Sequence, residues 1–177
     1  LQGLEQARGR ITAATIFALL RRHGDGYHPA TAPVHSGLCM HAGPQKDRWW
    51  QADGVMVADV KVQDILVWVT GTSANCLSIF KPVFPGVELP DIGPLPTEHF
   101  DPRCLWWKHE LLHRRAMADF DRLVPEIRTD FDRLEGGFLA EAPAVRRGTA
   151  VEKRQFVEHC FRRAMEETER WIARLSA

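Results

Sequence analysis

The sequence predicts an α+β fold in which an antiparallel sheet packs against long helices. Three short runs rich in Val, Ile, Trp and Met lie within residues 34–84, separated by Gly, Pro, Asn, Asp and Gln, which is typical of strands joined by turns. Segments on both sides of this stretch repeat apolar residues at helical spacing. The chain has 177 residues, 45% hydrophobic and 26% charged, so we expect one domain or part-domain with a sizeable core.

The strand-forming stretch is expected to hold three adjacent antiparallel strands, at residues 34–42, 54–60 and 66–70, and then an extended segment through Phe84. The segment VQDI at residues 62–65 is expected to close a hairpin between the second and third strands. The third run ends in TGTS, four small residues. Small residues at a strand end allow a substrate or a second backbone to approach closely.

A first helix is predicted over residues 4–22, where apolar residues recur at helical spacing, and it is expected to end at the following HGDG segment. Residues 85–102 contain five prolines, which neither a helix nor a central strand tolerates. We therefore expect this part of the chain to be a surface connection without regular structure.

Two further helices are predicted, over residues 103–134 and 149–175. Pro125 is expected to kink or divide the first of these, and the glycine pair at residues 136–137 is expected to follow its end. The last helix is expected to begin at Thr149, because this residue opens a Thr-x-x-Glu capping box.

The charge balance and the cysteines limit the classes of partner and cofactor. Lys+Arg and Asp+Glu are both 23, and no apolar run reaches the roughly 20 residues that a bilayer requires, so neither nucleic acid nor a membrane is expected as a partner. No pair of cysteines has the Cys-x-x-Cys spacing of a zinc knuckle, so no cofactor is expected. We expect reduced thiols and a cytoplasmic location. The cysteines are Cys39, Cys76, Cys104 and Cys160.

Four segments resemble a known family. VHSGLCMHAG, DGVMVADV and VWVTGTSANCLSIFKPVF, all within residues 34–84, and LWWKHELLHR at residues 105–114 are similar to the C-terminal half of the secernin-like dipeptidases. These are cysteine peptidases (C69 type) of the N-terminal-nucleophile class, and the resemblance spans about residues 4–175. It implies an αββα sandwich and hydrolysis of amide bonds in short peptides.

The nucleophile of that family is a cysteine at the mature N-terminus, whereas this chain begins with Leu1. We therefore expect the catalytic thiol to lie in an upstream N-terminal portion of the same protein, and the isolated chain to be inactive. The expected partners are that portion and a short peptide substrate, and unpaired sheet edges favour a homo-oligomer. A non-catalytic role in secretion, as described for some secernin relatives, is an alternative.

The segment TGTSANC at residues 70–76 supplies candidate pocket residues. Thr72 and Ser73 carry hydroxyl donors, and Asn75 has an amide that would orient a carbonyl, so this strand end has the groups of an oxyanion site. His41, at the end of the first expected strand, is a candidate for the same pocket. The alternative is a plain turn whose hydroxyls bind their own backbone.

The segment His109-Glu110-Leu-Leu-His113 matches the HExxH pattern of zinc peptidases, in which two histidines one helical turn apart bind zinc and the glutamate acts as a base. Glu135 would be the third ligand of such a zinc metallopeptidase. Pro125 lies between the motif and Glu135, and a glycine pair directly follows Glu135, so Glu135 is not at a convincing position for a third ligand. The family resemblance also explains the segment without a metal. We therefore favour no metal at these residues.

Cys39 is an alternative nucleophile. His35 and His41 lie four residues before it and two residues after it, so strand alternation would place all three side chains on one face. Plain packing in the core is the favoured interpretation, because free cysteines are commonly buried.

Overall fold

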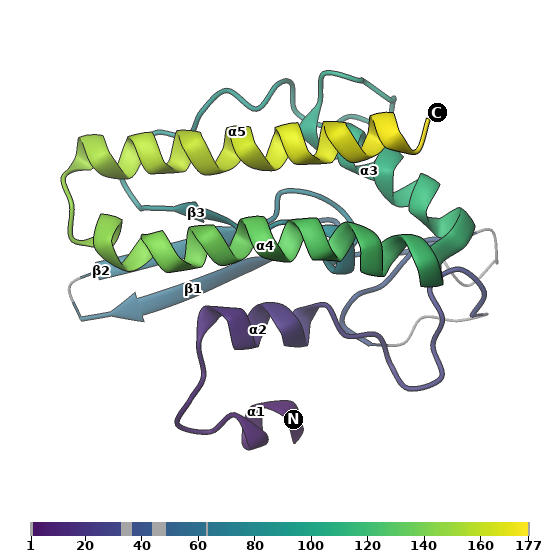
Figure 1. Ribbon diagram of the computed structural model, residues 1–177, viewed down its shortest axis with the longest axis horizontal. Helices are drawn as coiled ribbons and strands as arrows, with labels where there is room; N and C mark the ends of the chain where they lie inside the picture. The colour runs from purple at the N-terminus through teal and green to yellow at the C-terminus, as the bar shows by residue number, and fades with distance from the viewer. Residues whose placement is uncertain (1, 33–36, 44–48, 63, 177) are drawn as a thin grey trace.

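The computed structural model describes residues 2–32, 37–43, 49–62 and 64–176. It is an α+β structure, as predicted, with a three-stranded antiparallel sheet and long helices. Figure 1 shows two long antiparallel helices, α4 (Phe120–Arg146) and α5 (Ala150–Arg174), lying side by side along the sheet, with the shorter α2 (Ala13–Leu20) below α4. The hydrophobic core lies between these helices and the sheet.

The sheet has the order β1 (Met56–Lys61), β2 (Asp64–Val69), β3 (Lys81–Val83), and all neighbours are antiparallel. Strands β1 and β2 form the predicted hairpin. Side chains alternate between the two faces of a strand, so Trp68 is buried at 2% exposure beneath the helices, whereas Met56 is 69% exposed.

The prediction of a first strand at residues 34–42 was wrong for the part of this range that the structure describes. Residues 33–36 lie outside the described part, and from Gly37 onward only an isolated bridge between His23 and Gly37 is present. Gly37 has φ +92°, and a Cβ there would lie 2.4 Å from the backbone nitrogen of Gly24. This close approach holds the segment against the end of α2 instead of the sheet. The third strand is β3, within the segment expected only to be extended.

The single helix predicted over residues 4–22 was also wrong, because the chain forms α1 (Gln2–Gln6) and α2 separately. Gly9 lies between them with φ +77°, which interrupts the helix. The hydroxyl of Thr12 accepts a hydrogen bond from the backbone N–H of Thr15, and the hydroxyl of Thr15 accepts one from the backbone N–H of Thr12, so a capping box starts α2 anew.

The helix predicted over residues 103–134 is divided, but not at Pro125. Helix α3 (Leu105–Ala116) ends in the short 3-10 helix η2 (Met117–Asp119), and α4 then continues past the glycine pair that was expected to follow its end. The helix passes the glycines because Phe131 and Phe138 on either side of them are buried in the core. Burial of large side chains outweighs a local propensity cost of about 1 kcal/mol per glycine.

Two predictions that depend on local signals are confirmed. Helix α5 begins directly after Thr149, whose hydroxyl and the side chain of Glu152 form the capping box. Residues 85–104 contain no helix or strand. None of the described helices has both the length and the apolar character to cross a bilayer.

Candidate metal centre

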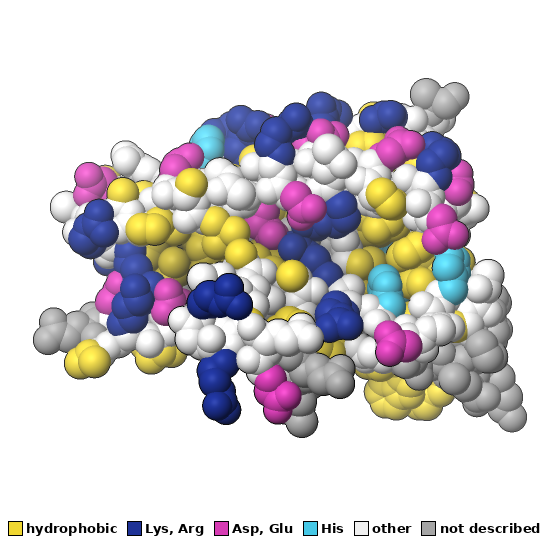
Figure 2. Space-filling model, turned by 60° about the horizontal axis from the view of Figure 1, so that its bottom comes forward, with side chains coloured by type: hydrophobic (Ala, Val, Ile, Leu, Met, Phe, Trp, Pro, Cys, Tyr) yellow, Lys and Arg dark blue, Asp and Glu magenta, His cyan; other side chains and the backbone are white. Residues whose placement is uncertain are grey.

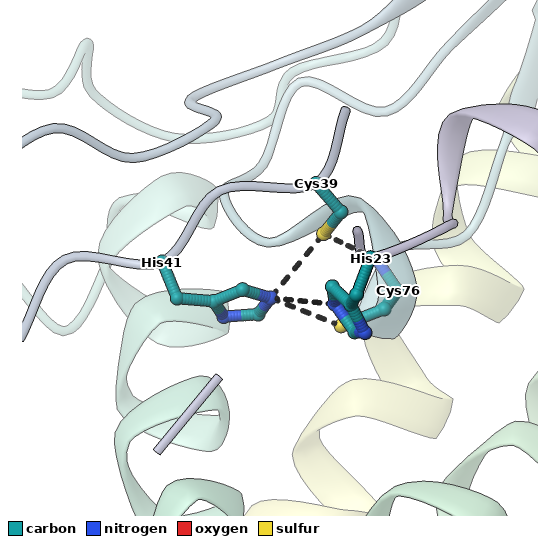
Figure 3. A group of neighbouring side chains, drawn as sticks. All are labelled: His23, Cys39, His41 and Cys76. Carbon is teal, nitrogen blue, oxygen red and sulfur yellow. Dashed lines mark hydrogen bonds between the residues drawn. The ribbon is translucent and has the colours of Figure 1, made fainter. Parts of the chain in front are cut away.

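Four side chains that are far apart in the sequence meet at one point. His23 follows α2, Cys39 and His41 lie in the irregular segment after it, and Cys76 lies in the 3-10 helix η1 (Asn75–Leu77) between β2 and β3. Figure 3 shows all four pointing toward one another. Their ligand atoms, two imidazole nitrogens and two sulfurs, all lie within 4.8 Å of one another.

The distances from His41 to the other three ligand atoms are close to those around a tetrahedral metal. Nε2 of His41 lies 3.3 Å from Sγ of Cys39, 3.5 Å from Sγ of Cys76 and 3.1 Å from Nε2 of His23. With Zn–N bonds of about 2.0 Å and Zn–S bonds of about 2.3 Å, tetrahedral ligand atoms lie about 3.3–3.8 Å apart. The three distances from His41 are therefore close to those in a tetrahedral zinc site, and all four ligand atoms lie within 4.8 Å of one another.

The centre is removed from solvent. Cys39 and His41 have no exposed surface, Cys76 is 5% exposed, and His23 is half-buried. Two thiolates would balance the two positive charges of a divalent ion, so the loaded centre would be neutral, which lowers the cost of burying it. Because four protein ligands complete a tetrahedron, no position is left open for water or substrate.

The protonation states favour ligation. The pKa of Cys39 is lowered, chiefly by its hydrogen bond with Cys76 and further by those with His23 and His41, whereas the same bond and burial raise the pKa of Cys76. Burial lowers the pKa of His41, which keeps the ring neutral at neutral pH. The lowered pKa of Cys39 favours the thiolate form that a metal requires, and deprotonation of Cys76 on metal binding would release a proton.

A chain of hydrogen bonds extends behind His41. Its Nδ1 lies 2.8 Å from Nε2 of His113, whose Nδ1 lies 3.0 Å from Oε2 of Glu110. The hydroxyl of Ser73 donates to the same carboxylate oxygen at 2.6 Å. Burial acts to raise the pKa of Glu110, but the hydrogen bonds of His113 and Ser73 and the charge of Arg114 lower it to about 2. The chain therefore ends in a carboxylate.

The HExxH residues do not form a metal group among the described residues. His109 is buried with Nε2 unpartnered in that part of the chain, while both ring nitrogens of His113 face His41 and Glu110. Glu135 accepts hydrogen bonds from Arg21 and from the backbone of Phe80. The motif thus contributes Glu110 and His113 behind the metal centre, a role that the sequence pattern did not suggest.

The other candidate pocket residues are buried and internally bonded. The hydroxyl of Thr72 lies 2.9 Å from that of Ser78, the hydroxyl of Ser73 binds Glu110, and the side-chain amide of Asn75 donates to the carbonyl of Leu20. Of the predicted pocket residues only His41 is a member of the metal group. His35 lies outside the described residues, so its expected pairing with Cys39 is not described.

A cavity of about 460 Å³ adjoins the centre, and His23 and Cys76 form part of its wall. Charged side chains of both signs and apolar side chains such as Phe120 also line it; the charged ones are Arg21, Arg128, Asp121 and Asp132. Figure 2 shows a face hollowed along its middle, where basic side chains lie between hydrophobic ones and histidines lie at one end. Two of the four candidate ligands therefore border the cavity, whereas Cys39 and His41 are not among its lining residues.

The sequence predicted none of the four residues as a metal ligand, although Cys39 and His41 were candidates for other roles. His23 lies in the segment that was expected to end a helix, and Cys76 lies at the end of the segment that was expected to supply pocket residues. The Cys39-x-His41 spacing was noticed but was assigned to one face of a strand. Without a Cys-x-x-Cys pair, the useful signal was this Cys-x-His segment combined with a second buried cysteine.

No family model, no curated protein and no solved structure matches this chain. The assignment of the centre therefore depends on its geometry.

Proposed function

We propose that this protein binds a zinc ion through His23, Cys39, His41 and Cys76. The observation that carries the proposal is the convergence of two thiols and two imidazoles, with their ligand atoms within 4.8 Å of one another, in a largely buried site. Thiolate and imidazole ligands in this geometry suit zinc better than magnesium or calcium, which prefer oxygen ligands. The sequence led us to expect no cofactor, and the proposal replaces that expectation.

The proposed role of the ion is to fix an irregular part of the chain. Within the described residues between α2 and β1, no helix or strand is present beyond the bridge at His23 and Gly37. Irregular segments of this length need an anchor or have a function of their own. The zinc ion would join three ligands near or within this segment to Cys76, beside the sheet. A closed coordination shell of this kind is typical of structural zinc sites.

Elemental analysis tests the proposal. We expect a single zinc ion per chain in protein purified without chelators, and its loss in Cys76→Ala, because removal of one thiolate leaves an incomplete tetrahedron. Cys160→Ala is the matched control, since Cys160 is equally buried but lies outside the metal group. Absence of metal from the parent chain after refolding with excess zinc would contradict the proposal.

The second candidate function is hydrolysis of short peptides by an αββα enzyme of the secernin-like type, with this chain as its C-terminal portion. The four similar sequence segments support it, and so does the open face of the sheet, where Met56 and Val60 are 69% and 67% exposed. An apolar sheet face of this kind is suited to packing against a second sheet.

For this candidate we expect no dipeptide cleavage by the isolated chain, because the nucleophile would belong to the upstream portion. Release of free amino acids from a set of dipeptides is the measurement, with and without that portion. Cleavage by the chain alone that disappears in Cys39→Ala would contradict the expectation and would make Cys39 the nucleophile.

A further inference from the structure

We propose that Glu110 and His113 are positioning residues that orient His41 toward the metal and thereby set the affinity of the centre. The inference rests on the proposed zinc site and adds the part of helix α3 that acts on it. His113 contacts His41, and Glu110 acts through His113, so neither residue would touch the ion.

The direction of the hydrogen bonds carries the argument. A metal on Nε2 of His41 requires the proton of that ring on Nδ1, where it is donated to Nε2 of His113 over 2.8 Å. His113 must then carry its proton on Nδ1, which donates to Oε2 of Glu110 over 3.0 Å. With a metal on Nε2 of His41, this arrangement of protons satisfies both bonds, and the lone pair of His41 is directed at the side of the ring where Cys39, Cys76 and His23 lie.

The carboxylate at the end of this chain is itself held in place. Glu110 is 4% exposed, its Oε2 accepts a hydrogen bond from Ser73 at 2.6 Å, and its Oε1 accepts one from Arg114 at 2.5 Å. Glu110 and His113 lie one turn apart on α3, which fixes their separation. The ring of His41 is therefore connected to a helix that packs in the core.

A carboxylate–imidazole chain behind a metal-bound histidine increases the basicity of the ligand and fixes its tautomer. Loss of such outer partners typically weakens metal binding by about 10- to 100-fold. We expect this loss for Glu110→Gln, which removes the charge and keeps the shape, and for His113→Leu, which removes both nitrogens.

His109→Leu is the matched control. His109 lies on the same helix, is 2% exposed, and forms no hydrogen bond to the four ligands within the described residues. The zinc affinity of each variant is measured by competition with a chromophoric chelator, and thermal unfolding of the metal-free proteins reports any general loss of stability.

Cobalt(II) absorption separates a positioning role from a structural one. We expect the thiolate-to-cobalt charge-transfer band to persist in Glu110→Gln, because both sulfurs remain, while the ligand-field bands shift because His41 becomes a weaker donor. A variant that had only lost packing would bind cobalt with an unchanged spectrum.

The inference would be overturned if Glu110→Gln and His113→Leu bind zinc with affinities within threefold of that of His109→Leu and show unchanged cobalt bands. If His113→Leu does not fold, Glu110→Gln decides the question, because it replaces one oxygen by nitrogen. Failure of the parent chain to bind zinc or cobalt is a different result, which would refute the metal centre itself.

Discussion

Zinc is expected to stabilise the metal-free protein by about 5 kcal/mol when free zinc exceeds the dissociation constant about 10⁴-fold, because the ion binds the folded centre and not an equivalent site in the unfolded chain. For a chain of this size each kcal/mol raises Tm by about 2–4 °C, so the melting temperature should rise by more than about 10 °C. The measurement is thermal unfolding in zinc buffers of graded free concentration.

Cysteine variants identify the site responsible for this stabilisation. Cys39→Ser should unfold at the same temperature with and without zinc, because the centre then lacks a thiolate. Cys160→Ser should keep the full zinc-dependent rise, since Cys160 is buried elsewhere in the core. An equal rise in Cys39→Ser would contradict the assignment of this ligand.

Replacement of Lys81 by methionine is expected to remove a pH dependence of stability that this one residue causes. Lys81 is 2% exposed, and its ammonium group donates to the carbonyls of Thr70 and Ile79 at 2.5 and 2.8 Å. Burial lowers its pKa to about 7, and Glu135 and Cys160 act in the opposite direction. No described carboxylate forms an ion pair with Lys81 within 4.0 Å.

The sign follows from proton binding. The unfolded chain keeps the proton of this lysine up to a pKa of about 10.4, so between about pH 7 and pH 10 the unfolded state binds more protons than the folded state. Stability therefore increases with pH in this window, by about 2 kcal/mol between pH 7 and pH 9. Lys81→Met should lose this increase and gain stability at pH 7.

Urea unfolding at pH 7 and pH 9 measures the effect. Lys61→Met is the control, because Lys61 is exposed on β1 and its replacement should leave the parental pH dependence intact. If the free energy of unfolding of Lys81→Met rises between pH 7 and pH 9 as much as that of the parent chain, groups other than Lys81 cause the pH dependence.

Local signals in the sequence predicted several elements correctly. The capping box at Thr149 defined the start of α5, the prolines defined the irregular connection at residues 85–102, and short β-branched runs gave the hairpin of β1 and β2. Each of these signals depends only on residues close together in the sequence: a helix cap, a proline that lacks an N–H group, or the alternation of side chains along a strand. Each can therefore be recognised without the tertiary structure.

Predictions failed where distant packing overrides local preference. The glycine pair at residues 136–137 reads as a helix end, yet α4 continues because the neighbouring phenylalanines are buried. The run at residues 34–42 reads as a strand, yet its described part lies against the end of α2, where Gly37 permits the close approach. Burial of apolar surface between secondary-structure elements contributes several kcal/mol to stability, which is more than the local conformational preferences that it opposes.

The α+β class, the long amphipathic helices, the hairpin and several residues capable of binding metal or orienting a carbonyl can be predicted from the amino-acid order alone. Which of those residues meet depends on how distant segments pack. The tertiary structure brought Cys76 and His23 to the Cys39-x-His41 segment, and it turned Glu110 and His113 toward His41 while His109 points elsewhere. A metal centre is defined by distances between atoms of separate segments, and no local pattern in this chain specifies those distances.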